Sequence, residues 1–419
     1  MVNYLEPAKG QKLFKVEIVN LFGGGGKFDI TPYVVMCSIY SSIDHPFMSI
    51  SCTISDEDSI LRRGAVNGDK SLLISITDGA GQTISGTFHI NSMTTKMISG
   101  RKSLGVEFIG MTAEHLNNAS QKVQEWIFRH NPQTITNIVK FVFNKYLKGS
   151  LQVNVSSSPA VNIDIPRQTP MQAIGFLLER AAGSGKNMFV LFQKFIDGKP
   201  KFCLDEVSKM ASAGPIRKFL MTESNMGEQE AHTINKQYVS GAKVCRILVF
   251  SQDSAFNVHD DVQQGYVSRE YVDIDYTNKI CTFTKDKSQP VTMGSPQHPE
   301  VNSACKAMAS PRETRTIYDP RCGDESYYVN PNLEEAYLKP KTSAAGFINK
   351  RITMSSYGCT DVNPGDVIEI DYPINDKDPQ KTLDPEVTGK YLVLAARHSV
   401  STNGEVYSQF ELGLDGKRA

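Results

Sequence analysis

The sequence of 419 residues lacks an excess of charge of either sign, because its 45 lysines and arginines balance its 45 aspartates and glutamates. A dedicated nucleic-acid binder needs a basic face that displaces counterions, so this balance argues against that class. No apolar run approaches the roughly 20 residues that a membrane span needs, and the N-terminus shows no basic segment followed by an apolar stretch. We therefore expect no secretory signal and no stable membrane insertion.

The cysteines lack the spacing of a metal site. Eight cysteines are spread along the chain, and none of them forms a Cys-x-x-Cys pair. Zinc ligands are normally paired at such short spacings, and a disulfide framework would be unusual in a large chain without a signal. We expect reduced thiols that act as small core residues, and no metal.

Catalytic motifs are also missing. The segment Gly183–Lys186 resembles the end of a phosphate loop, but Arg180 stands where the first glycine is needed and the segment follows a predicted helix. No His-Glu-x-x-His or Gly-x-Ser-x-Gly motif is present, and Trp126 is the only tryptophan, which disfavours an aromatic platform for sugars. We expect no catalytic, cofactor-binding or metal-binding residue, no cofactor, and no enzymatic activity.

The sequence is instead rich in strand patterns, which predict a mainly β fold with an α+β insertion. Residues 1–115 contain six or seven short segments of the type Phe14–Val19, in which apolar and polar residues alternate, separated by glycine turns. This pattern predicts a first small β-barrel over residues 1–115.

Residues 116–207 change to helical periodicity and predict an α/β domain. One helix is expected to begin at Asn131-Pro132 and to end at Gly149, and a second is expected to begin at Thr169 with a capping box. Two strands joined through Asp197-Gly198 complete the predicted domain.

Residues 208–240 and 343–419 together predict a second small β-barrel, which closes with a hairpin of residues 391–398 and 406–414 across an Asn-Gly turn. Between them, residues 241–342 are rich in proline, which breaks regular elements. We expect an inserted, loop-rich β domain there, with one hairpin over residues 269–284.

The two ends of the chain resemble each other. Gly86 and Gly389 each open a long hairpin and lie 303 positions apart, as do Gly110 and Gly413 near the hairpin ends. In that register Phe88 corresponds to Tyr391, and Ile90 corresponds to Val393. The chain is therefore predicted to contain two similar barrels.

This organisation resembles the baseplate hub proteins of contractile phage tails, and the hub portion of type VI secretion spike proteins shares the plan. Four short segments carry the resemblance: Asn67-Gly68-Asp69 before a strand, residues 169–178, residues 363–368 and residues 389–398. The likeness is one of architecture over most of the chain and does not involve an active site. Residues 241–342 match least.

The resemblance implies a homotrimer that forms a structural hub in the virion tail baseplate and is assembled in the host cytoplasm. Three chains with two barrels each would present six barrels, so one pseudo-six-fold ring could join the hexameric tail tube protein to the trimeric central spike protein. Other baseplate proteins would surround the hub, and DNA would pass through its lumen without specific binding. Because the sequence stops after the second barrel, we expect the spike to be a separate chain.

Two alternatives stay open from the sequence. A tail-associated cell-wall hydrolase would have its site in the loop-rich region, where His259, Asp260 and Asp261 are the first residues to test. A receptor- or glycan-binding module would use the long loops of residues 286–346.

Overall fold

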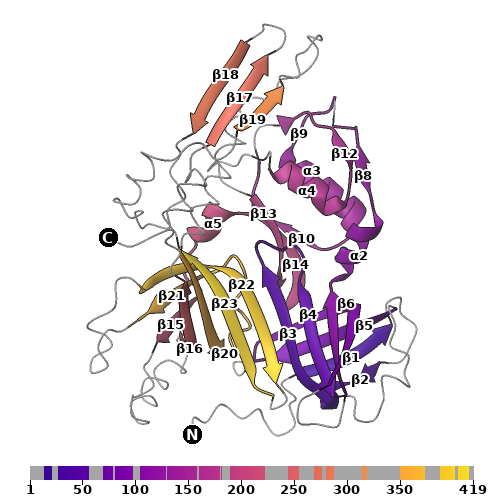
Figure 1. The fold of residues 1–419 in the computed structure, drawn as a ribbon, viewed down its shortest axis with the longest axis vertical. Coiled ribbons are helices and arrows are strands. Elements are labelled where there is room, and N and C mark those ends of the chain that lie inside the picture. The colour runs from indigo at the N-terminus through magenta and orange to yellow at the C-terminus, as the bar shows by residue number, and fades with distance from the viewer. Residues whose placement is uncertain are drawn as a thin grey trace.

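The structure is a computed structural model that describes most of the chain (Figure 1). The described residues are 14–20, 27–55, 69–78, 81–97, 104–128, 130–157, 160–179, 181, 189–221, 244–253, 269–275, 280–286, 314–318, 350–372, 387–401 and 404–414. Most of them lie in strands, so the predicted mainly β fold is confirmed. None of the helices in these ranges is long and apolar enough to cross a membrane.

The N-terminal strands form what we call the first half. Its strands are β1 (Phe14–Asn20), β2 (Phe28–Asp29), β3 (Val34–Ser42), β4 (Ser49–Ser55), β5 (Lys70–Thr77), β6 (Thr83–Met97) and β7 (Leu104–Met111), with a 3-10 turn η1 (Thr31–Tyr33) before β3. They pair in the order β2-β1-β5-β6-β7-β4-β3. Alternate residues point inward, so Leu72, Ile74 and Ile76 of β5 are fully buried together with Phe88 and Phe108.

The C-terminal strands form the second half, which is a closed ring. Its strands are β15 (Arg217–Met221), β16 (Val244–Asp253), β20 (Lys350–Tyr357), β21 (Val367–Asp371), β22 (Gly389–Ser401) and β23 (Val406–Leu414). The order β22-β21-β15-β16-β20-β23 returns to β22, so each strand has two partners. Phe219, Tyr391 and Phe410 fill its core.

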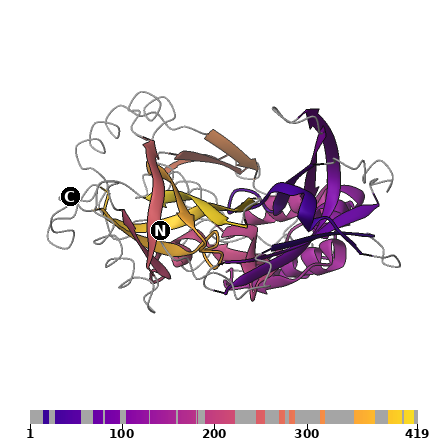
Figure 2. The same cartoon turned by 90° about the horizontal axis from the view of Figure 1, so that it is seen from below.

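The two halves are joined edge to edge, and both views show them side by side (Figures 1 and 2). β3 pairs antiparallel with β22, from Ser42 opposite Ala395 to Met36 opposite Ser401. A single 13-stranded sheet therefore runs through both predicted barrels.

The predicted repeat is visible in the strand register. Gly86 lies opposite Ile74 of β5, and Gly389 lies opposite Ile370 of β21. The next inward positions, Phe88 and Tyr391, are both fully buried. The 303-residue correspondence between β6 and β22 is therefore confirmed.

Two β-bulges occur at equivalent places in both halves. β6 has an extra residue between Ile90 and Ser92, and β22 has one between Val393 and Ala395. β3 and β16 likewise each have an irregularity after their first paired residue, between Val34 and Met36 in β3 and between Ile247 and Val249 in β16. Since a bulge shifts every later side chain to the other face, matched bulges keep the same inward faces in both halves.

One predicted correspondence is displaced by a residue. Gly110 lies opposite Ile90, whereas the position opposite Val393 is Leu412 and not Gly413. The reason is that the hairpin after the bulge is one residue shorter in the second half. With that correction Phe108 corresponds to Phe410.

An α/β unit is inserted along the chain between the two halves. It comprises α2 (Ala113–Ser120), β8 (Val123–Glu125), β9 (Gln133–Thr134), α3 (Ile135–Val142), η2 (Phe143–Leu147), β10 (Leu151–Val153), β11 (Ala160–Val161), β12 (Ile165–Gln168), α4 (Pro170–Leu178), β13 (Phe189–Ile196), β14 (Lys199–Glu206) and α5 (Val207–Ala211). α3 and α4 pack over strands β13 and β14 in one core that includes Ile138, Leu177 and Phe202.

The helix starts in this unit test the sequence signals. The capping box at Thr169 is confirmed, with the Thr169 N–H donating to Gln172 Oε1 at 3.1 Å. The predicted cap at Asn131-Pro132 is wrong, because residues 133–134 form a short strand and Thr134 caps α3 instead. The first helical segment ends at Leu147, and Lys148 takes the left-handed conformation just before Gly149.

The inserted unit contacts both halves. Its β13–β14 hairpin turns at Asp197-Gly198 as predicted, with φ angles of 54° and 73°, and the Gly198 carbonyl accepts a hydrogen bond from Ser85 N of β6 at 2.7 Å. On the other side, Phe192 and Met210 pack against Leu392 of β22. The inserted unit therefore packs against both halves beside the paired strands β3 and β22.

The region 241–342 is described only in part. The predicted hairpin is present as β17 (Arg269–Asp275) and β18 (Ile280–Asp286), and β19 (Thr314–Tyr318) pairs parallel with β17. β16, which also falls within this range, does not belong to that three-stranded sheet. It pairs with β15 and β20 of the second half.

Candidate functional site at the junction of the sheet halves

The residues named for an enzymatic alternative do not form a described site. His259, Asp260 and Asp261 lie outside the described residues, as does the segment Gly183–Lys186. Trp126 lies on the surface of the inserted unit with 55% of its area exposed. In the described part of the chain, no three His, Cys, Asp or Glu residues are grouped so that they could hold a metal ion.

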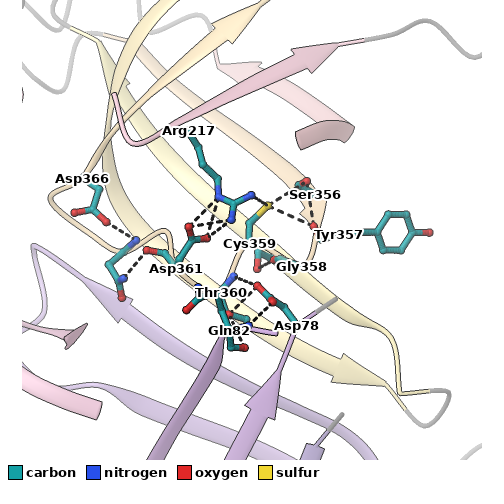
Figure 3. A network of polar contacts seen from close by, with 12 residues as sticks. Asp78, Gln82, Arg217, Ser356, Tyr357, Gly358, Cys359, Thr360, Asp361 and Asp366 are labelled. Atoms are coloured by element: carbon teal, nitrogen blue, oxygen red, sulfur yellow. Dashed lines mark hydrogen bonds and ion pairs between the residues drawn. The ribbon is translucent and has the colours of Figure 1, made fainter. Parts of the chain in front are cut away.

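Among the described residues, an extensive polar cluster is instead built around the loop of residues 358–366, which we call the junction loop (Figure 3). It runs from β20 to β21 and begins with two residues of positive φ, Gly358 at 65° and Cys359 at 62°. This sharp reversal turns the loop back over the end of the second half, and the Gly358 N–H donates to Val406 O at 2.8 Å. The loop is thereby held where it can reach the other two units.

The first contact of the junction loop is with the first half. Asp78, at the end of β5, is 2% exposed and Thr360 is fully buried. The Asp78 carboxylate accepts hydrogen bonds from Thr360 N at 3.2 Å, Thr360 Oγ1 at 3.0 Å and Gln82 N at 2.9 Å. Three donors satisfy a buried carboxylate that would otherwise be costly to desolvate.

The second contact is an ion pair within the second half. Arg217, the first residue of β15, donates from Nε to Asp361 Oδ1 and from Nη2 to Asp361 Oδ2, both at 2.9 Å. The side chains are 13% and 32% exposed, respectively. This two-pronged geometry suits arginine and fixes the loop to the strand that closes the ring.

The third contact is with the inserted unit. Asn363 Oδ1 accepts from Phe195 N of β13 at 3.0 Å, and Asn363 Nδ2 donates to the Asp361 carbonyl at 2.9 Å. Asp366 accepts from Asn363 N at 2.9 Å and forms an ion pair with Lys194 at 3.3 Å. Burial raises the pKa of Asp366, and the nearby Lys194 ammonium opposes that rise.

Gly365 allows this third contact because nothing larger fits. Its φ is +84°, and a Cβ placed there would lie 2.7 Å from Met210 Sδ and 2.9 Å from Phe192 Cζ. Its N–H donates to Val393 O at 2.8 Å. The turn Asn363–Asp366 therefore lies directly against β13, α5 and β22.

A buried histidine lies beneath the start of the loop. His398 is fully buried, and its Nδ1 lies 2.8 Å from Ser408 Oγ. Ser408 in turn donates to the Gly358 carbonyl. Burial lowers the pKa of His398 to about 4, so the ring is neutral at physiological pH.

The hydrogen bonds and ion pairs of the cluster hold the two halves and the inserted unit together. Its carboxylates are engaged by arginine, lysine, hydroxyl or backbone donors, and they lie in a packed loop instead of facing a reactive group. The described cysteines Cys37, Cys52, Cys203 and Cys359 are buried and form no disulfide, in agreement with the predicted core thiols. Burial raises the pKa of Cys203 to about 11, which leaves it as an unreactive thiol.

Sequence reasoning located only part of this cluster. It singled out residues 363–368 as one of the segments that carry the resemblance, but it did not identify the partners Arg217 and Thr360. Thr360 and Asp78 are 282 positions apart, and Arg217 and Asp361 are 144 apart, so no local pattern connects them.

Comparison with known proteins shows the fold. No protein-family model and no curated protein matches the sequence. A tail protein from Neisseria meningitidis MC58 is similar in structure, with 14% identity, a TM-score of 0.53, and coverage of 96% of this chain and 97% of that one. The 43 kDa tail protein of prophage MuSo2 from Shewanella oneidensis is similar with 9% identity, a TM-score of 0.55, and coverage of 96% and 98%.

A component of the type VI secretion system of E. coli aligns over 92% of this chain and 76% of its own length, with 10% identity and a TM-score of 0.46. The two alignments show that this chain shares the fold of two tail proteins, one of them from a prophage.

Proposed function

We propose that this protein is a structural component of a phage tail, and specifically the baseplate hub of a contractile tail. It forms a homotrimeric, pseudo-six-fold ring that joins the hexameric tail tube to the trimeric central spike, contacts other baseplate proteins, and lines the channel through which the genome passes. The shared fold with two tail proteins supports the tail role. The finer assignment rests on the internal repeat.

The observation that carries the proposal is the pair of equivalent sheet units in one chain. They share strand order and matched bulges, and they already pair edge to edge through β3 and β22. Three copies of such a chain present six similar units, which reconciles three-fold and six-fold neighbours in one ring. The formal net charge of zero is consistent with a channel that does not retain DNA.

We propose a domain division that follows the strand pairing. Residues 1–115 form the first tube-type barrel, residues 116–207 form the α/β domain, and residues 208–240 and 343–419 belong to the second barrel. β16 pairs inside the second barrel, so we propose that the inserted domain begins after Asp253 and not at residue 241.

The number of copies in the proposed assembly can be measured by native mass spectrometry. Native mass spectrometry of the purified full chain at micromolar concentration is expected to show three copies, and electron microscopy of particles with this chain labelled is expected to place it on the tail axis at the baseplate. A chain that stays monomeric and is absent from the axis of assembled particles would contradict the proposal.

The absence of enzymatic activity is tested separately. We expect no clearing in a peptidoglycan zymogram with the full chain. Clearing that is lost in His259→Ala would support the hydrolase alternative instead.

A further inference from the structure

Two buried cysteines face each other in the first half. Cys37 of β3 lies directly opposite Cys52 of β4, and the antiparallel pairing continues without a shift to Tyr40 opposite Ser49. Both cysteine side chains are fully buried, and they form no disulfide. Directly opposed residues of antiparallel strands project to the same face of the sheet, so both thiols point into the core of the first half.

The spacing of opposed residues on these strands suits a disulfide. Directly opposed residues of an antiparallel pair have Cα atoms about 4.5–5.5 Å apart, and disulfides join Cα atoms about 4.4–6.8 Å apart. Two other cysteines with described side chains are placed differently, because Cys203 lies opposite Phe192 and Cys359 lies in the junction loop. Among the buried cysteines that the structure describes, Cys37 and Cys52 are therefore the pair that one covalent bond can join.

Side chains from the second half and the inserted unit cover the cysteine pair. Val400 of β22 lies opposite Cys37 on the side away from Cys52, and it is fully buried. Val406 of β23 and Phe195 of β13 belong to the same core cluster. The hydrogen bond with the Cys52 thiol, together with burial, raises the pKa of Cys37 well above its ordinary value. While the cover is in place, Cys37 is therefore a thiol that solvent does not reach and that forms little thiolate.

We propose that Cys37 and Cys52 are a latent cross-strand disulfide, which forms with an organic disulfide such as oxidised glutathione when the pairing of β3 with β22 opens. Opening withdraws Val400 from Cys37 and leaves β3 attached to the first half through β4. The bond then fixes β3 to β4 in register, so that the strand edge stays formed until β22 returns. This inference concerns a single chain and does not depend on the proposed ring.

The reaction is a thiol–disulfide exchange in two steps. Cys37, the residue next to β22, loses its proton and attacks one sulfur of oxidised glutathione, which gives a mixed disulfide and releases one glutathione that takes up a proton. Cys52 then loses its proton and attacks the Cys37 sulfur, which releases the second glutathione. The two cysteines give up two electrons and two protons, and oxidised glutathione takes up both to become two thiols.

Peptide mass spectrometry of the full chain tests the bond. Trypsin leaves both cysteines in one peptide of residues 28–62. After incubation with oxidised glutathione, we expect this peptide to escape alkylation and to be lighter by two hydrogen atoms. Chymotrypsin cleaves between the cysteines, at Tyr40 or Phe47, and should leave the two parts linked until dithiothreitol is added.

Single variants are the controls for the pair. Cys37→Ala and Cys52→Ala cannot form the bond, so the remaining thiol should instead retain glutathione as a mixed disulfide. A native chain in which Cys37 and Cys52 are still alkylated after prolonged oxidation, or in which either of them is linked mainly to another cysteine, would overturn the proposed bond.

The dependence on opening is tested by two matched Thr→Val variants. Thr360→Val removes a hydrogen bond to Asp78 that joins the two halves, so it should raise the population of the open state and speed formation of the bond by about three- to ten-fold. Thr136→Val removes a buried hydroxyl that bonds Ser157 within the inserted unit, and it should leave the rate unchanged. Equal rates in the native chain and Thr360→Val, or an equal increase in both variants, would show that separation of the halves does not control the reaction.

Discussion

The two sheet halves share one strand plan and differ in how it is completed. In both halves the strands equivalent to β5, β6, β7, β4 and β3 pair in the same order with bulges at matching places. The sixth strand differs, because β1 pairs antiparallel with β5, whereas β15 pairs parallel with both β21 and β16 and closes the ring. The comparison teaches that the five-stranded unit is the repeated element and that β15 is the additional strand that closes the second half.

The difference also places the polar cluster. β15 carries Arg217, which anchors the junction loop, and the loop then reaches Asp78 of the first half. The second half thus carries the loop and its anchor, and the first half contributes one buried carboxylate. The following substitutions test how far the equivalence extends, from the largest expected effect to the smallest.

The most direct test removes the equivalent core aromatics. Phe108 and Phe410 are both fully buried, so Phe108→Ala and Phe410→Ala should each lower the free energy of unfolding by about 3–5 kcal/mol. Urea unfolding gives the total loss, and hydrogen exchange shows whether it is confined to the half that carries the change. Phe→Leu at each site is the milder control, and a loss in one half several-fold larger than in the other would break the equivalence.

A second test uses pH and the buried His398, whose equivalent in the first half is Thr95. Burial lowers the pKa of His398 to about 4 in the folded protein, below its ordinary value of 6.5. As pH falls from 6.5 toward 4 the unfolded chain gains a proton that the folded chain does not, so stability decreases by up to about 3 kcal/mol. His398→Gln should flatten this part of the stability profile measured by urea unfolding.

The control for the histidine test is His115, whose pKa is lowered by partial burial and less strongly than that of His398. His115→Gln should change the slope less than His398→Gln. An unchanged slope in His398→Gln would show that another group dominates this pH range.

A third test compares two glycines with nearly the same backbone angle. Gly81 in the first half and Gly365 in the second have φ of +82° and +84°, but a Cβ at Gly81 meets nothing within 4 Å. Both alanine variants incur the strain of positive φ, and Gly365→Ala should lose about 1–3 kcal/mol more because it also overpacks against Met210 and Phe192. Thermal unfolding of both variants measures the difference, and equal losses would mean that the loop yields at little cost.

The smallest expected effect is at the bond between the halves. Thr360→Val removes the Oγ1 donor to Asp78 but keeps the shape and the backbone N–H bond, so the loss should be about 1 kcal/mol. Hydrogen exchange should rise in peptides that contain Asp78 and Thr360 while other regions stay unchanged. Thr360→Ser keeps a hydroxyl and should behave as the native chain.

Much of the fold could be predicted from local patterns. Alternation and Asn-Gly or Asp-Gly turns predict hairpins such as β13–β14 and β22–β23, and the matched glycines at 86 and 389 predict the repeat, because these signals lie within a few residues. The helix start at Asn131-Pro132 was wrong because tertiary pairing of β9 with β11 takes the residues just before α3 into a strand.

The rest depends on contacts between distant residues. The place of β15 and β16 in the ring is set by pairing with β21 and β20, which lie about 100 to 150 positions further along the chain. The junction residues Asp78, Arg217 and Thr360 have no distinctive neighbours in sequence, and only the packed fold brings them together. Sequence patterns therefore predict the separate strands, hairpins and helices, but they do not predict the long-range contacts that join the two halves.

The pairing of β3 with β22 has a consequence for biosynthesis. Ser42 and Ala395 face each other across this pair although about 350 residues separate them in the chain. At roughly 5–20 residues per second, a ribosome needs tens of seconds to synthesise the residues between β3 and β22. During that time the edge of the nascent β3 strand has no β22 to pair with. We therefore expect the soluble yield of this protein to respond to translation speed and to chaperones that shield nascent strands, even in variants whose finished fold is as stable as the native one.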